Sequence, residues 1–266
     1  MTTEACTTFA TWLAALHASS QRLAAAVGGL SERELSGPSF ADGWSVAQVL
    51  SHLGSAAEIG AGLVGRGLAG STQAPSRPEI EPVWERWNAL GPAEQREHWR
   101  QADARHLRLL DSLDERQRAT LRVPYFAGLL DPSAYAGYRL SEQSVHAWDV
   151  EVALDPAAVI PAAETALLWE RLDLVATRFR DGATLSRLAP AAVTVQRTGE
   201  PRAAALLLTA ELHLYPCEPA DPTGELTGET EELIRLVYGR NRPERDALTA
   251  VGPVSLEDLR ALFPGY

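Results

Sequence analysis

Residues 43–59 read GWSVAQVLSHLGSAAEI, and residues 142–154 read EQSVHAWDVEVAL. In the first stretch Ser45 stands three residues before Gln48, which is the pattern of a capping box at the start of a helix. The helix is expected to continue towards Gly70, which places His52 well inside it. The second stretch has a comparable helical pattern, and these two segments organise the N-terminal half of the chain.

Three more helical segments accompany the first one. Residues 8–28 repeat apolar side chains at helical spacing until two glycines end the pattern. Residues 84–113 form a long amphipathic pattern, and Asp131-Pro132 is a typical start for a helix over about 133–154. Four long helices predict an all-α N-terminal domain with the fold of a four-helix bundle.

The C-terminal part has a different pattern. Pro156 and Pro161 indicate a domain boundary, so we predict domains at 1–156 and 157–266. The elements expected in the second domain are a helical segment at 162–179, two strands at 191–198 and 203–215, and short helices that start near Thr230 and Ser255. The predicted fold class is therefore α+β overall, with a helical bundle followed by a small α+β domain.

Composition narrows the functional classes. The net charge is -11 and the chain has no lysine, which argues against a nucleic-acid partner and excludes Schiff-base chemistry and a P-loop lysine. Cys6 and Cys217 have no CxxC spacing, so we expect a reducing compartment. No apolar run approaches the roughly 20 residues of a membrane span, and the N-terminus has no signal-peptide pattern. A cytoplasmic protein without a membrane partner is expected.

A candidate metal site links the two quoted stretches. Glu142 and His146 are four residues apart, so both side chains lie on one face of their helix. His52 from a facing helix completes a set of two histidines and one carboxylate, which leaves coordination positions open. Asp149 is placed to orient His146. By spacing alone, the Glu142–His146 pair fits a solvated helix face equally well.

Several further residues are candidates for catalysis or binding. Tyr135 and Tyr138 lie within about 40° of Glu142 on an ideal helix and are predicted to bind substrate, although aromatic packing suits them too. Arg139 and Arg240 are candidates to bind an anionic group of a substrate or cofactor, and surface positions suit both equally. We predict Arg240 and Asp149 as catalytic residues, and Tyr135, Tyr138 and Arg139 as substrate-binding residues.

The two quoted stretches, in this order and at this separation, resemble the mycothiol-dependent maleylpyruvate isomerase family within the DinB-like superfamily. In that family an N-terminal bundle binds zinc through residues that correspond to His52, Glu142 and His146. The segment ELIRLVYGR at 232–240 also resembles the family's second domain, a small sterol-carrier-like α+β fold. The resemblance implies two cofactors, which are zinc or another divalent metal, and mycothiol.

The resemblance further implies an enzyme in which a zinc-bound thiolate attacks an electrophilic small molecule, either as an isomerase or as a thiol S-transferase. A monomer or homodimer is expected. Two alternatives remain open at this point. One is a zinc-dependent hydrolase, and the other is a non-catalytic protein that binds a ligand or a partner. A test of whether turnover requires a thiol distinguishes the thiol-dependent enzyme from the hydrolase, because a hydrolase needs no thiol.

Overall fold

The computed structural model describes residues 7–265, and contacts between Cα atoms divide the chain into two compact units, 1–159 and 160–266. The predicted domain boundary at 156/157 lies three residues before this division. No helix in the described part of the chain is both long enough and apolar enough to cross a membrane.

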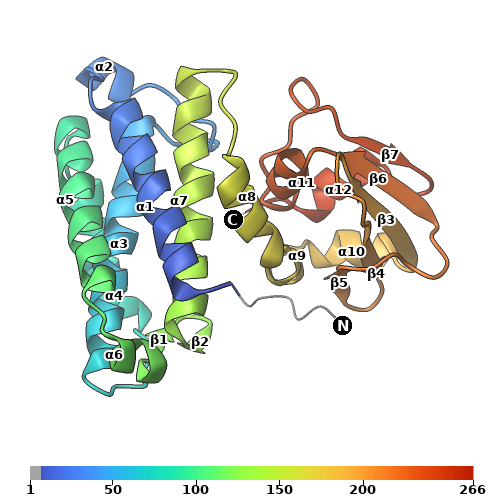
Figure 1. Ribbon diagram of the computed structural model, residues 1–266. Coiled ribbons are helices and arrows are strands. Elements are labelled where there is room, and N and C mark those ends of the chain that lie inside the picture. The colour runs from blue at the N-terminus through green and yellow to red at the C-terminus, as the bar shows by residue number, and fades with distance from the viewer. Residues whose placement is uncertain (1–6, 266) are drawn as a thin grey trace. The chain divides into compact units, whose positions relative to one another are not determined.

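The first unit is a helical bundle (Figure 1). Its elements are α1 (Phe9–Val27), α2 (Glu32–Leu35), α3 (Val46–Leu68), α4 (Arg77–Asn88), α5 (Pro92–Asp111), α6 (Glu115–Thr120), β1 (Val123–Tyr125), β2 (Gly128–Leu130) and α7 (Pro132–Leu154). Helix α3 packs against α5, helix α1 packs against α7, and the pairs α1–α5 and α3–α7 also touch. The four long helices therefore surround one core, whose buried side chains include Leu23, Leu50, Leu53, Trp99 and Val150.

The second unit combines a sheet with short helices (Figure 1). Its elements are α8 (Ala162–Glu170), α9 (Leu172–Phe179), α10 (Gly182–Leu188), β3 (Ala191–Arg197), β4 (Ala204–Leu208), β5 (Leu212–Tyr215), β6 (Gly224–Gly228), α11 (Thr230–Val237), β7 (Thr249–Val251) and α12 (Leu256–Leu262). The strand order is β5-β4-β3-β6-β7, in which β3 and β6 are parallel and the other neighbours antiparallel. Apolar side chains from the sheet, α9 and α11 line one interior. The predicted α+β fold class with an all-α N-terminal domain is confirmed.

The prediction of one helix over 84–113 is wrong. The chain forms α4 and α5 instead, and α5 begins at Pro92 with Gly91 as its N-cap residue. Gly91 has an extended ψ of 161°, which breaks the path of α4, and a proline lacks the N–H that a continuous helix needs. Proline is tolerated in the first turn of a new helix, so the break falls at this position.

The prediction of one strand over 203–215 is also wrong. Residues 204–208 and 212–215 form two antiparallel strands, β4 and β5. Thr209 turns the chain between them, because its backbone N–H and its hydroxyl both donate to the carbonyl oxygen of Glu211. The predicted helical segment 162–179 is similarly divided at Arg171 into α8 and α9. Local apolar patterns continue through both breaks and do not reveal them.

Candidate metal centre

His52 is presented by α3. The Ser45 hydroxyl accepts a hydrogen bond from Gln48 N at 3.2 Å, and Ser45 N donates to Gln48 Oε1 at 2.8 Å, so the predicted capping box is present. This cap fixes the first turn of the helix. His52 lies in the second turn, with its side chain 32% exposed. The imidazole therefore remains accessible from one side.

Glu142 and His146 are presented one turn apart by α7. Asp131 caps this helix by accepting from Ala134 N at 2.9 Å, and Pro132 occupies its first turn. Most of the helix is buried, and this packing limits the directions of its side chains. The Glu142 side chain is 23% exposed, whereas that of His146 is 5% exposed.

The three side chains converge from two helices. His52 Nε2 lies 3.0 Å from Glu142 Oε2, and His146 Nε2 lies 4.0 Å from the same oxygen. One ligand atom from each residue lies within 4.8 Å of the other two. Tetrahedral zinc with bonds of about 2.1 Å holds its ligand atoms roughly 3.4 Å apart, so small side-chain adjustments bring this set into coordinating geometry. The donor set fits a divalent ion such as zinc.

Asp149 orients His146. The Asp149 side chain is fully buried, and its Oδ2 lies 2.8 Å from His146 Nδ1. An ionised carboxylate only accepts hydrogen bonds, so His146 donates from Nδ1. In the neutral tautomer that carries its proton there, Nε2 presents its lone pair on the side of Glu142. A backbone hydrogen bond from Phe40 N to the Asp149 carbonyl oxygen, 2.8 Å long, ties this part of α7 to the loop before α3.

Glu142 is ionised at neutral pH. Burial raises the pKa of its carboxyl group, but the hydrogen bond from His52, the charges that the two histidines carry when protonated, and the charge of Arg139 together lower it more, to about 2. The carboxylate is thus available as a ligand without losing a proton. Two imidazoles and one carboxylate, partly open to solvent, are the donor types of catalytic metal sites with free coordination positions.

The indole of Trp44 borders the same cluster. Its ring stacks on that of His146 with 5.9 Å between centroids and 15° between planes, and it lies 5.2 Å from the His52 ring. Trp44 is 37% exposed, so it forms an apolar wall beside the histidines at the surface. Trp44 belongs to the first sequence motif, but the sequence did not predict that its ring contacts the two histidines.

The predicted substrate-binding tyrosines differ in position. Tyr135 is fully buried, and its hydroxyl lies 2.8 Å from His106 Nε2. Gly60 makes room for this pair, because a Cβ atom there would lie 2.3 Å from the Tyr135 hydroxyl oxygen. Tyr138 is partly exposed, with its ring 5.1 Å from that of Tyr125. Of the two, Tyr138 is the one that keeps an accessible surface.

Arg139 and Arg240 lie in different units. Arg139 is 2% exposed on α7, one turn before Glu142. Arg240 follows α11 in the second unit, where it is 6% exposed and donates from Nη1 to the Tyr238 carbonyl oxygen at 2.7 Å. Both arginines are buried, whereas surface positions suited them equally by sequence alone. Their predicted roles stay predictions.

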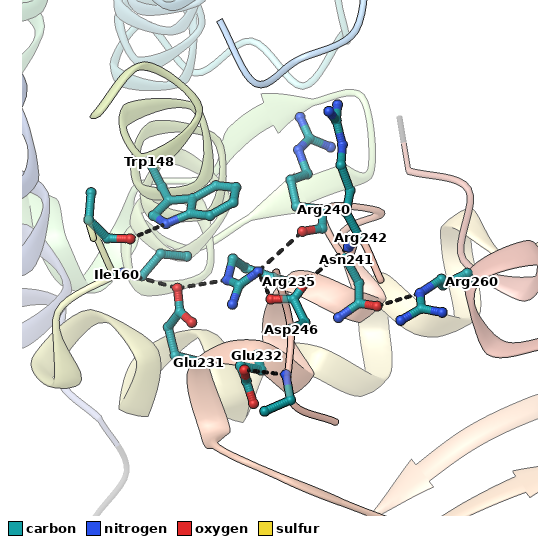
Figure 2. Close-up of polar contacts among 12 residues, drawn as sticks. Trp148, Ile160, Glu231, Glu232, Arg235, Arg240, Asn241, Arg242, Asp246 and Arg260 are labelled. Carbon is teal, nitrogen blue, oxygen red and sulfur yellow. Dashed lines mark hydrogen bonds and ion pairs between the residues drawn. The ribbon is translucent and has the colours of Figure 1, made fainter. Parts of the chain in front are cut away.

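A buried ion pair holds the segment that carries Arg240 (Figure 2). Arg235 pairs with Asp246, donates from Nε to Glu231 at 2.8 Å and donates from Nη1 to the Arg240 carbonyl oxygen at 3.3 Å. In Figure 2 the side chains of Arg240 and Arg242 extend away from Asp246. The backbone at Arg240 is therefore fixed by contacts that the local sequence does not reveal.

Comparisons with known proteins identify a family and a shared fold. The family model described as the mycothiol maleylpyruvate isomerase N-terminal domain matches residues 16–151, more than half of the 266-residue chain. Crystal structures of a mycothiol-dependent maleylpyruvate isomerase and of a mutant of that enzyme match with TM-scores of 0.69 and 0.68, each at 17% sequence identity. In both cases the match covers 94% of this chain and 95% of the other. A search of curated protein sequences finds no match.

Proposed function

Because this chain belongs to the mycothiol maleylpyruvate isomerase family, we propose that it is a mycothiol-dependent enzyme, an isomerase or thiol S-transferase, with a metal site formed by His52, Glu142 and His146. The substrate is proposed to be an electrophilic small molecule. The observation that carries the proposal is the convergence of these three side chains, from helices far apart in sequence, on a partly exposed site with an oriented histidine.

A bound divalent ion supplies a Lewis acid that keeps a thiol in its nucleophilic thiolate form at neutral pH. The corresponding reactions are reversible thiolate addition to an activated alkene, which permits cis–trans isomerisation, and net transfer of the thiol to the substrate. The isomerisation consumes no thiol, because the carbon–sulfur bond that forms in the addition is broken again when the alkene is restored.

The protein's own residues prepare the site. The hydrogen bond from His146 to Asp149 fixes the tautomer and direction of the imidazole, and Glu142 contributes a negative charge without a proton-transfer step. Trp44 covers part of the cluster and limits the access of water from its side. Tyr138 is the proposed contact for the substrate on α7.

Metal analysis tests the proposed site. Purified untagged chain is expected to contain about one zinc or other divalent ion by mass spectrometry, the stoichiometry of a single site. His52→Ala and His146→Ala are expected to lose the metal, whereas His98→Ala, which removes an exposed histidine outside the cluster, is expected to retain it. Wild-type protein that neither contains nor binds a divalent ion would overturn the metal site.

Thiol dependence tests the reaction class. The metal-loaded chain is expected to isomerise maleylpyruvate or a related activated alkene, or to transfer mycothiol to an electrophile, only when mycothiol is present. Turnover of an ester or amide without thiol would instead identify a hydrolase. If the metal-loaded chain turns over none of these substrates, the binding-protein alternative is favoured.

A further inference from the structure

The loop after α11 carries Arg240, which the sequence predicts as a catalytic residue. Helix α11 ends in a Schellman motif, in which two backbone hydrogen bonds close the last turn. Gly239 N donates to the Leu236 carbonyl oxygen at 3.0 Å, and the next residue, Arg240, donates from its N to the Arg235 carbonyl oxygen at 2.7 Å. Gly239 has a φ of 71°, the left-handed conformation that this motif requires and that glycine adopts without strain. The end of the helix therefore sets the backbone position of Arg240.

The side chain of Arg235 returns to the same residue. Its Nη1 donates to the Arg240 carbonyl oxygen at 3.3 Å. Arg235 thus holds both backbone polar groups of Arg240, the N–H through its own carbonyl oxygen and the C=O through its guanidinium. The Arg240 side chain then donates from Nη1 to the Tyr238 carbonyl oxygen at 2.7 Å. The direction of the Arg240 guanidinium therefore depends on where Arg235 places the backbone.

Asp246 connects Arg235 to the far side of the loop (Figure 2). The side chains of Arg235 and Asp246 form an ion pair and are 5% and 0% exposed. The Oδ2 atom of Asp246 also accepts a hydrogen bond from Arg242 N at 2.7 Å. One buried ion pair therefore fixes the loop backbone at two positions, Arg240 and Arg242.

Neighbouring residues of two helices support this pair and the loop. The Nε atom of Arg235 donates to Glu231 Oε1 at 2.8 Å, one turn earlier on α11, so the guanidinium contacts two carboxylates. Arg260 of α12 donates from Nε to Asn241 Oδ1 at 2.6 Å, in the middle of the loop. The loop is therefore anchored to α11 and α12, which is the rigid support that a precisely oriented side chain needs.

A buried ion pair is not needed for stability alone. Removing two charges from water costs about as much free energy as their attraction returns, and apolar side chains of similar volume are often as stable. An apolar pair at positions 235 and 246 could neither donate to the Arg240 carbonyl oxygen nor accept from Arg242 N. What the charged pair adds here is direction, because its hydrogen bonds restrict the loop backbone to one geometry.

We propose that Arg235 and Asp246 are positioning residues for Arg240, and that their ion pair directs the Arg240 guanidinium towards an anionic group of the substrate. An arginine binds a carboxylate through two parallel hydrogen bonds, and this contact depends on the direction of the guanidinium. A misplacement of about 1 Å in an active site costs up to about a hundredfold in rate. The inference rests on the proposed function and extends it to two residues that do not themselves contact the substrate.

A double substitution separates positioning from stability. Arg235→Met with Asp246→Leu replaces the ion pair by apolar side chains of similar length, so the melting temperature is expected to stay at or above that of the wild type. In the metal-loaded full chain at saturating mycothiol, its kcat/KM for the electrophile is expected to fall at least about tenfold. The loss is expected in the same parameter, kcat or KM, that Arg240→Met changes, whereas partial unfolding would lower kcat alone.

A double-mutant cycle shows whether the pair acts through Arg240. In the Arg240→Met background, Arg235→Met with Asp246→Leu is expected to cause no further loss of kcat/KM, because the side chain that the pair positions is already absent. Equal losses with and without the Arg240 side chain would overturn the proposal. Wild-type kcat/KM in Arg240→Met, or in the protein that lacks the ion pair, would also overturn it.

A second variant keeps the proposal falsifiable if the double substitution does not fold. Asp246→Asn has the same shape and can still accept from Arg242 N, but it removes the charge that holds Arg235. It is expected to lower kcat/KM several-fold, and a wild-type value would overturn the proposal. Arg187→Met is the matched control, because Arg187 forms an exposed ion pair with Asp258 at 2.7 Å in the same unit. It is expected to leave kcat/KM unchanged, and an equal loss there would refute a specific role of the buried pair.

The same measurements distinguish failure of this inference from failure of the proposed function. A metal-loaded wild type without thiol-dependent turnover would overturn the proposed function and this inference with it. Wild-type turnover together with unchanged kcat/KM in the variants would overturn the inference alone. The metal content of every variant is expected to equal that of the wild type, because the substituted residues lie in the second unit and the metal cluster lies in the first. Loss of metal in proportion to the loss of activity would overturn the positioning role.

Discussion

Substitution of Asp149 by asparagine is predicted to weaken metal binding while leaving the three proposed ligands in place. The Asp149 carboxylate is fully buried and accepts from His146 Nδ1 at 2.8 Å. Asparagine has the same shape and still offers an oxygen to Nδ1, but it carries no charge. The imidazole of His146 then becomes a weaker ligand, because a charge-assisted hydrogen bond to its N–H raises its basicity.

The expected effect is a 10- to 100-fold loss of metal affinity, the usual range when the partner of a metal-binding histidine is changed. This corresponds to about 1.4–2.7 kcal/mol, since each 1.4 kcal/mol is a factor of ten. The Asp149 side chain is completely buried, so solvent does not screen its contact with His146. We therefore expect a loss of metal affinity nearer to about 100-fold than to tenfold.

Competition with a chromophoric chelator measures this affinity directly. Asp155→Asn is the matched control. Asp155 is exposed just after α7, so this substitution removes the same negative charge at a position away from the cluster. Circular dichroism establishes that both variants remain folded. Affinity of the Asp149→Asn protein within twofold of the wild type would refute the assigned role of Asp149. An equal loss in Asp155→Asn would attribute the effect to net charge.

Three further predictions concern the stability of the bundle. Burial holds the pKa of His106 well below its usual value, and the charge of Arg139 lowers it further. Below pH about 6.5 the unfolded chain therefore takes up a proton on this histidine, whereas the folded chain does not. Stability is therefore expected to fall by up to about 1.4 kcal/mol per pH unit below that point, and urea midpoints at pH 7 and pH 5 should differ less in His106→Gln. Gly54→Ala is expected to cost about 1–3 kcal/mol in thermal denaturation, because its Cβ would lie 2.3 Å from two ring atoms of the buried Trp87. Gly62→Ala on the same helix meets no atom within 4 Å and is expected to raise stability by up to about 1 kcal/mol; a loss there would contradict the packing argument.

Local signals predicted the helices of the bundle well. The capping box at Ser45 and the Asp131-Pro132 start are chemical features of a few adjacent residues, and both helices begin where these features predict. Breaks were harder to predict. Pro92 begins α5 after a change of chain direction at Gly91, although the apolar spacing continues across it.

The sheet of the second unit was predicted only in part. Strand β3 was expected from its alternating β-branched residues, whereas β6 (Gly224–Gly228) and β7 (Thr249–Val251) were not predicted. Strand β6 contains two glycines and pairs in parallel with β3. Parallel pairing joins segments distant in sequence, so its stabilisation leaves no periodic signal within the strand itself.

By itself, the sequence determined the family, the α+β fold class and the Glu142–His146 pair, because motif order, helical spacing and capping are local properties. Only the tertiary structure decided which partners meet. It brought His52 within 3.0 Å of Glu142, buried Asp149 against His146, and enclosed Arg139 without an ionic partner among the described residues. Burial and contacts between helices depend on how whole helical faces pack together, and no short segment of sequence specifies that packing.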